Sequence, residues 1–165
     1  MILVALGGNL PSRHGSPRQT LAAALDALAK HGIKPVGISR FYVSLPVPPS
    51  PQPNYVNAVV AVETALSPAE LLSALHLIEA EFGRRRTVLN EARSLDLDLI
   101  DYQGRVTGAG AVPELPHPRM HERAFVLAPL SEVAPGWRHP VLERTVDELL
   151  AEVPAADRAQ CRPAQ

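Results

Sequence analysis

The segment RSLDLDLID (residues 93–101) alternates leucine with aspartate, and this alternation predicts a β-strand with one apolar face. Successive side chains of a strand point to opposite faces, so its three leucines would face a hydrophobic core. Asp96 and Asp98 would share the other face, with carboxylates roughly 6–7 Å apart that repel each other. An acidic strand surface in water would explain this pair. A divalent-cation site would also explain it, because Mg²⁺ accepts one or two carboxylates plus phosphate oxygens and water.

Three more strands and two helices are expected around this strand. Apolar runs predict strands at residues 2–8, 34–44 and 55–64, and a proline-rich loop, residues 45–54, precedes the last of these. Each helix would begin with a serine cap, a proline in its first turn and the partner residue of a capping box, and a glycine would end it. These residues are Ser16, Pro17, Gln19 and Gly32 for the first helix, and Ser67, Pro68, Glu70 and Gly83 for the second.

The resulting order, β-α-β-β-α-β, predicts an α+β fold with a ferredoxin-like core, in which helices pack on a mostly antiparallel sheet. Two later segments would cover the other face and complete a three-layer αβα arrangement. One is a short helix within residues 120–130, interrupted near Pro129. The other begins at the capping box of Thr145 and Glu148.

The composition is that of an ordinary globular domain. The chain has 165 residues and is 46% hydrophobic, so residues 1–165 are expected to form a single domain, with residues 156–165 as a flexible tail. The 16 basic and 17 acidic residues give a net charge of -1, which argues against nucleic-acid and membrane partners. A single cysteine, Cys161, and an N-terminal apolar run too short for a signal peptide favour the cytoplasm.

Basic residues precede the acidic strand in the sequence. Arg84, Arg85 and Arg86 follow the second helix, and Arg93 stands just before the aspartates. Offsetting a helix dipole needs fewer cations, whereas guanidinium groups match phosphate oxygens. Carboxylates that could hold Mg²⁺ beside arginines that could hold phosphates are typical of phosphoryl-type transfer, although the GxxxxGK[ST] loop is absent. His117, between two prolines, could donate a hydrogen bond to a phosphate or simply occupy a turn.

Four segments together resemble one family, the 6-hydroxymethyl-7,8-dihydropterin pyrophosphokinases, and the likeness runs through almost the full length. These segments are LGGN (residues 6–9), SRFYVSLPVPPSPQPNYVNAVV (residues 39–60), RSLDLDLIDYQG (residues 93–104) and LPHPRMHERAFVLAPLSEVAP (residues 115–135). Each segment alone is a weak signal, but the acidic segment followed by the PHPRM segment is highly specific.

The resemblance implies that the β,γ-diphosphate of ATP moves to the hydroxymethyl oxygen of the pterin, with release of AMP, in folate biosynthesis. It implies two Mg²⁺ ions bound by Asp96 and Asp98, and catalytic roles for these aspartates, Arg84 and Arg93. The positions that match ATP-binding residues are His76, Glu79, Arg84, Arg86, Arg93, Leu99, His117 and Arg123. The positions that match pterin-binding residues are Ser44, Leu45, Val47, Tyr55, Asn57 and Phe125. A monomeric, cytoplasmic enzyme acting on ATP and the hydroxymethyl dihydropterin is therefore expected.

Three features depart from the family pattern, one of which is Gly8, where serine is common. Many members carry tryptophan, glycine and proline ahead of the arginine before the acidic strand, where this chain has NEAR (residues 90–93) and is one residue shorter. His76 stands where many members carry glutamine.

Two other functions fit parts of the sequence. A metal-dependent phosphohydrolase would use the aspartates and arginines, but it would leave Tyr55, Asn57 and Phe125 unexplained. A binding module without catalytic activity is the second alternative, because the ferredoxin-like order hosts many functions.

Overall fold

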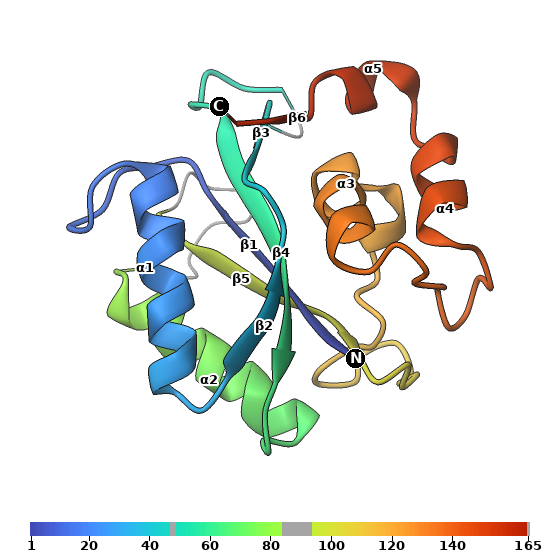
Figure 1. Cartoon of the computed structure of the whole chain (residues 1–165), viewed down its shortest axis with the longest axis horizontal. Helices are drawn as coiled ribbons and strands as arrows, with labels where there is room; N and C mark the ends of the chain where they lie inside the picture. The colour runs from blue at the N-terminus through green and yellow to red at the C-terminus, as the bar shows by residue number, and fades with distance from the viewer. Residues whose placement is uncertain (47–48, 84–93, 165) are drawn as a thin grey trace.

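The computed structural model describes residues 1–46, 49–83 and 94–164, and in them one antiparallel sheet carries helices on both faces (Figure 1). The strands are β1 Ile2–Gly8, β2 Lys34–Ile38, β3 Tyr42–Ser44, β4 Tyr55–Glu63, β5 Asp96–Tyr102 and β6 Arg162–Pro163. The order in the sheet is β5-β1-β4-β3-β6, and β2 also pairs with β4. The described strand pairs are antiparallel, as predicted.

The helices on one face of the sheet are the two early ones, residues 17–30 and 68–81, and residues 124–133 and 146–152 form helices on the other face (Figure 1). The helices are α1 Pro17–Lys30, α2 Pro68–Glu81, α3 Ala124–Val133, α4 Val146–Glu152 and α5 Ala155–Ala159, with a 3₁₀ turn, η1 Met120–Glu122. The predicted capping boxes at the starts of α1, α2 and α4 are present, and both glycines after α1 and α2 have positive φ. Local sequence signals therefore define where these helices begin and end.

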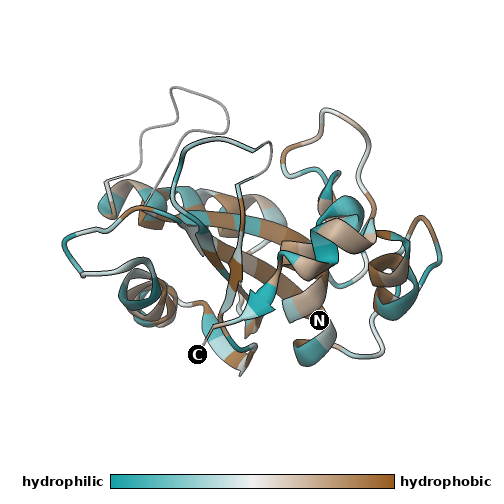
Figure 2. Ribbon diagram, turned by 90° about the horizontal axis from the view of Figure 1, so that it is seen from above, coloured by the Kyte–Doolittle hydropathy of each residue, from teal (hydrophilic) through white to brown (hydrophobic). Residues whose placement is uncertain are grey.

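The sheet separates two hydrophobic cores, and the strands between them are largely apolar (Figure 2). The first core joins the sheet to α1 and α2 and includes Val4, Leu6, Leu21, Leu28, Leu71, Leu75, Leu95, Leu97 and Leu99. The second core joins the sheet to α3 and α4 and includes Leu3, Val59, Ile100, Leu127, Leu130, Trp137 and Leu149. The leucines of the acidic segment are thus buried as predicted, and Asp96 and Asp98 point to the opposite face, where they are half-buried.

A β-bulge in β5 changes the alternation just after the acidic pair. Leu3 pairs with Asp101 and Val4 pairs with Leu99, so Ile100 is an extra residue in the ladder. Ile100 therefore contributes to the second core although Leu99 belongs to the first. Asp101 faces the same side as Ile100, and its carboxylate accepts a hydrogen bond from Trp137 Nε1 at 3.1 Å.

The strand predicted at residues 34–44 is divided into β2 and β3. Ser39 lies at the break, and its hydroxyl accepts a hydrogen bond from the backbone N–H of Val59 at 3.0 Å. A side-chain oxygen thus takes the place of a ladder carbonyl, which interrupts the regular pairing. This bond to a partner 20 residues away in sequence explains why an apolar run that is continuous in sequence forms two strands.

The helix predicted to break near Pro129 breaks instead at Arg123. Arg123 separates η1 from α3 with an extended backbone conformation, and Pro129 lies inside α3. The prediction of an interruption at Pro129 is therefore wrong. Proline at that position removes one helical hydrogen bond, a cost that the burial of Pro129 beside the second core offsets.

The flexible tail predicted for residues 156–165 is instead part of the fold as far as residue 164. β6 pairs with β3, the N–H of Ala164 donates to the carbonyl of Phe41 at 2.6 Å, and Cys161 is buried in the second core. A strand added to the open side of β3 satisfies backbone groups that would otherwise be exposed. Among the described helices, none is long and apolar enough to cross a membrane.

The thiol of Cys161 reports whether the tail is packed. Burial raises its pKa from 9.0 to about 11, which makes the reactive thiolate roughly 100-fold scarcer at pH 8. We expect iodoacetamide to alkylate Cys161 at pH 8 at least about 100-fold more slowly in the native chain than in urea. Mass spectrometry would measure the two alkylation rates. Equal rates in the two states would contradict the packed tail.

Candidate active site

Residues predicted for the metal and for the pterin lie in one row across the sheet. Asp96 of β5 pairs with Gly7 of β1, and Gly7 pairs with Asn57 of β4. Adjacent strands are about 4.8 Å apart, so Asp96 and Asn57, two strands apart, are about 10 Å apart across the row. Asp98 pairs with Ala5, one step further along the same face.

The face of this row is the one that carries the second core. Ala5 and Val59 pack in the second core, and Gly7 and Asn57 are each two residues away along the same strands. Side chains two apart in a strand share a face. The end of the sheet that carries Asp96, Gly7 and Asn57 therefore faces the same side as the segments that begin α3.

Gly7 is a member of the row that sequence reasoning did not single out. A Cβ atom at this position would lie 2.9 Å from Oδ1 of Asn57, closer than such atoms normally approach. Glycine thus leaves room for the Asn57 amide over β1. The available signal was the glycine pair that ends the first apolar run, Gly7 and Gly8.

The predicted pterin residues next to this row are held by hydrogen bonds. Asn57 and Ser44 are both buried, and Asn57 Nδ2 donates to Ser44 Oγ at 2.7 Å. Tyr55 is half-buried, whereas Leu45, at the start of the proline-rich loop, is 42% exposed. A buried amide with a fixed partner presents its oxygen in a defined direction, which suits recognition of a polar ring edge.

The proline-rich loop is tied to the loop after β1. Asn9 is buried, and its Nδ2 atom donates to Gln52 Oε1 and to the carbonyl of Pro53, both at 3.1 Å. Loop positions are thus coupled to the strand that carries Gly7. Asn9 belongs to the LGGN segment. Its hydrogen-bond partners lie more than forty positions away in sequence, so the segment alone could not predict them.

His117 and Arg123 approach the acidic pair from the second layer. The backbone N–H of His117 donates to the carbonyl of Ile100 at 3.0 Å, which holds this segment against β5. The pKa of His117 is lowered to about 4, mainly by burial and also by Arg123 and Arg119, while Asp96 acts in the opposite direction. The imidazole is therefore neutral at pH 7.

The tautomer of His117 follows from its local hydrogen bond. The backbone N–H of Arg119 donates to His117 Nδ1 at 3.1 Å, so Nδ1 is an acceptor. In the neutral ring the proton is then on Nε2, which can donate to a ligand. Arg119 stands in the PHPRM segment and was not predicted as a site residue, although its charge affects both His117 and Arg123.

Arg123 connects the acidic pair with the aromatic residue predicted for the pterin. Burial lowers its pKa, and the negative charges of Asp98 and Asp96 act in the opposite direction. An arginine remains charged in this environment. Its Cζ atom also lies 5.4 Å from the centroid of the Phe125 ring. The Arg123 guanidinium thus interacts both with the acidic pair and with the Phe125 ring.

The acidic pair fits a hard divalent cation. Within the described residues, no group of three or more His, Cys, Asp or Glu gathers to hold a metal. Two carboxylates on one strand face match Mg²⁺, which takes its remaining ligands from phosphates and water. The pair, the charged Arg123 and the neutral His117 can together hold a phosphate-bearing ligand with its metal.

Glu79, His76 and Leu99, predicted to bind ATP, lie elsewhere around β5. Glu79 is 1% exposed on α2, and its Oε2 atom accepts a hydrogen bond from the backbone N–H of Leu97 at 2.8 Å. His76 is exposed on the same helix. The side chain of Leu99 is in the first core, so a ligand could reach only its backbone.

Four predicted site residues, Val47, Arg84, Arg86 and Arg93, lie outside the described residues. The NEAR segment ahead of the acidic strand also lies outside them.

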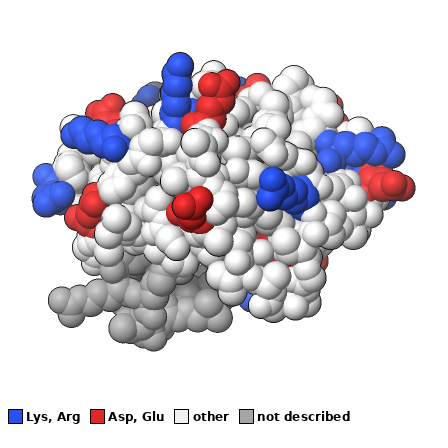
Figure 3. Space-filling model, turned by 90° about the horizontal axis from the view of Figure 1, so that it is seen from below, with Lys and Arg blue, Asp and Glu red and all other residues white. Residues whose placement is uncertain are grey.

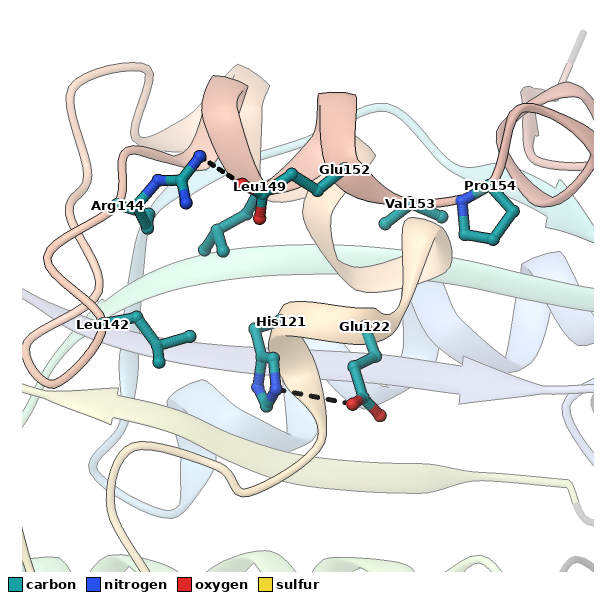
Figure 4. Close-up of a pocket in the computed structure, with 8 residues that line it drawn as sticks. All are labelled: His121, Glu122, Leu142, Arg144, Leu149, Glu152, Val153 and Pro154. Atoms are coloured by element: carbon teal, nitrogen blue, oxygen red, sulfur yellow. Dashed lines mark ion pairs between the residues drawn. The ribbon is translucent and has the colours of Figure 1, made fainter.

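A pocket of about 320 Å³ lies between η1 and α4 and contains none of the predicted site residues (Figure 4). Its lining residues are His121, Glu122, Leu142, Arg144, Leu149, Glu152, Val153 and Pro154. Within it, Arg144 forms an ion pair with Glu152, and His121 Nε2 lies 3.6 Å from Glu122 Oε1. Because this pocket contains none of the predicted site residues, we assign the candidate site to the row of Asp96, Gly7 and Asn57.

The chain matches the family described as 7,8-dihydro-6-hydroxymethylpterin-pyrophosphokinase (HPPK) over residues 3–135. A 2-amino-4-hydroxy-6-hydroxymethyldihydropteridine pyrophosphokinase from Pseudomonas aeruginosa is 41% identical over 154 residues, 93% of this chain and 91% of the relative. The protein of the same name from Haemophilus influenzae is 42% identical over 132 residues, 79% of each chain. The chain therefore belongs to the HPPK family.

Solved structures support the fold. A variant HPPK-DHPS from Plasmodium falciparum, crystallised with pterin and p-hydroxybenzoate, has a TM-score of 0.75 at 13% identity. The match covers 98% of this chain and 46% of that one, so this chain spans less than half the length of the solved protein. At this identity the likeness shows a shared fold.

Titration of His117 tests the electrostatics of the site. By NMR, its ring should titrate near pH 4, well below an ordinary histidine. Arg123→Gln should raise the pKa because a nearby cation is removed, and Asp96→Asn should lower it because a stabilising carboxylate is removed. A ring that titrates near pH 6.5 in all three proteins would contradict this arrangement.

Proposed function

We propose that the protein transfers the β,γ-diphosphate of ATP to the hydroxymethyl oxygen of 6-hydroxymethyl-7,8-dihydropterin, giving the pterin diphosphate and AMP, in folate biosynthesis. The printed names of relatives that match over most of this chain support this reaction. The observation that carries the proposal is the row of Asp96, Gly7 and Asn57. It brings a candidate metal site and a candidate ring-binding site onto one sheet face, about 10 Å apart across the row.

The pterin would bind beside Asn57. The Asn57 amide can offer both a donor and an acceptor to the polar edge of the ring, and its bond to Ser44 orients it. Phe125 offers a flat face for stacking. Tyr55 and Leu45, with Val47, would complete the walls of the site.

The triphosphate of ATP would lie on the side of Arg123, His117 and the acidic pair. Asp96 and Asp98 would hold two Mg²⁺ ions, which, when bound, supply positive charge that offsets the charge on the transferring phosphates. Arg84, Arg86 and Arg93 are the further arginines of the proposal. His76 and Leu99 would contact the nucleotide, the latter through its backbone.

Transfer itself exchanges one bond to phosphorus for another. The hydroxymethyl oxygen forms a bond to the β-phosphorus, and the bond from the β-phosphorus to the oxygen it shares with the α-phosphate breaks. AMP leaves with that oxygen, and the hydroxyl proton passes to solvent water. His117, with a pKa of about 4, is a poor base at pH 7. The N–H group at Nε2 of the neutral ring would instead donate a hydrogen bond to a phosphate oxygen and orient it.

The charge distribution supports small-molecule substrates. On the face shown in Figure 3, acidic and basic side chains are interspersed, and the net charge of the chain is -1. A nucleic-acid partner usually requires a basic patch. The proposal includes a monomeric enzyme in the cytoplasm.

Formation of AMP tests the proposed reaction. With ATP and Mg²⁺, we expect AMP only when the hydroxymethyl dihydropterin is present, and Asp96→Asn should lower kcat/KM by about 100-fold or more because charge neutralisation is lost. Asp26→Asn, which changes an exposed carboxylate on α1, is the matched control. Phosphate release from ATP without the pterin would support a phosphohydrolase instead, and no Mg²⁺-dependent reaction or binding at all would support a binding module.

Gly7→Ala tests the shared row. The added methyl group would displace the Asn57 amide at a cost of about 1–3 kcal/mol, so binding of a pterin analogue should weaken about tenfold while binding of an ATP analogue is retained. Gly37→Ala is the control, because a Cβ there would make ordinary contacts of 3.6 and 3.7 Å with Val133 and Ala61. Calorimetric affinities that are unchanged in Gly7→Ala would contradict the role of this glycine.

A further inference from the structure

The outer edge of β5 depends on a side chain from α2. In the sheet, β5 lies at the end of the strand order, with β1 as its neighbour. The backbone N–H of Leu97 points away from β1 and donates to Glu79 Oε2 at 2.8 Å. Backbone donors at a sheet edge need a partner when they are buried. Glu79, at 1% exposure, supplies this partner from the neighbouring helix.

The bonded N–H belongs to the peptide unit between the two candidate metal ligands. Asp96 precedes Leu97 and Asp98 follows it, so the bond to Glu79 restrains the backbone that carries both carboxylates. Glu79 is itself on a helix anchored in the first core by Leu75 and Ile78, which have no exposed surface. The backbone of the acidic pair is therefore held by α2, which packs on the opposite face of the sheet.

Glu79 and the carboxylates reach β5 from different sides. The acidic pair shares the face of the second core, whereas α2 packs on the first core. One oxygen of Glu79 already accepts the Leu97 hydrogen bond. Residues that orient metal ligands typically contribute a factor of roughly 10–100 to metal affinity.

We infer that Glu79 is a positioning residue, which orients Asp96 and Asp98 for Mg²⁺ by bonding to the Leu97 backbone. This inference rests on the proposed function, because it takes the acidic pair as the metal site. It differs from the nucleotide contact that family resemblance implies for Glu79. The hydrogen bond to Leu97 needs an acceptor oxygen at position 79, which the amide of a glutamine would also supply.

Two substitutions separate these roles. Glu79→Gln keeps an acceptor oxygen and removes the charge, whereas Glu79→Leu removes both at similar size. Glu81→Gln, on the same helix, is the control, since Glu81 is 43% exposed and pairs with His31. The measurements are the Mg²⁺ concentration for half-maximal binding of a non-hydrolysable ATP analogue, the affinity for this analogue in EDTA, and hydrogen exchange of the Leu97 amide by NMR.

We expect Glu79→Gln to retain Leu97 protection and Mg²⁺ dependence within about twofold. Glu79→Leu should lose the protection and raise the required Mg²⁺ by roughly 10–100-fold, with unchanged affinity in EDTA. The inference would be overturned if Glu79→Gln bound the ATP analogue more weakly in EDTA while its Leu97 amide stayed protected from hydrogen exchange. This test can be made even if Glu79→Leu does not fold. Wild-type Mg²⁺ dependence in a folded Glu79→Leu would also overturn it. A wild-type chain without Mg²⁺-dependent binding would overturn both this inference and the proposed metal site.

Discussion

Two like charges held on one face of an edge strand impose the main constraint on this protein. Asp96 and Asp98 repel each other, and their half-burial strengthens that repulsion by limiting the access of water. Their placement cannot be relaxed by a shift of the strand, because a one-residue slip would bury the carboxylates and expose the leucines. Arg123 lies near both carboxylates and offsets part of this charge. A bound divalent cation would offset the remainder.

The surrounding structure serves both sides of the site with few elements. The start of α3 provides Arg123, which interacts with the acidic pair, and Phe125, the residue proposed to stack on the pterin. β1 passes between the carboxylates and Asn57, and Gly7 leaves space for the amide above it. Sheet register, rather than loop conformation, therefore sets the separation of the two halves. The proposed transfer between two bound substrates would depend on this separation, because reaction rates depend strongly on relative position.

Much of the fold was predictable where the deciding interactions are local. The alternation in β5 and the capping boxes of α1 and α2 depend on residues close in sequence, and these predictions are confirmed. The split at Ser39, the packed tail and the bonds of Glu79 and Asn9 depend on partners distant in sequence. Residue identities at the site could be matched by family resemblance, but periodicity could not place Asp96 opposite Gly7 or reveal the close approach of Asn57. Pro129 was misjudged because packing against the second core outweighs helix propensity.

Binding of Mg²⁺ by the acidic pair together with the phosphates of ATP is tested most directly by a crystal structure of the protein with Mg²⁺ and a non-hydrolysable ATP analogue. We expect carboxylate oxygens of Asp96 and Asp98 at about 2.1 Å from Mg²⁺, with phosphate oxygens completing the coordination beside Arg123 and His117. Carboxylates free of metal and directed away from a bound nucleotide would contradict the account.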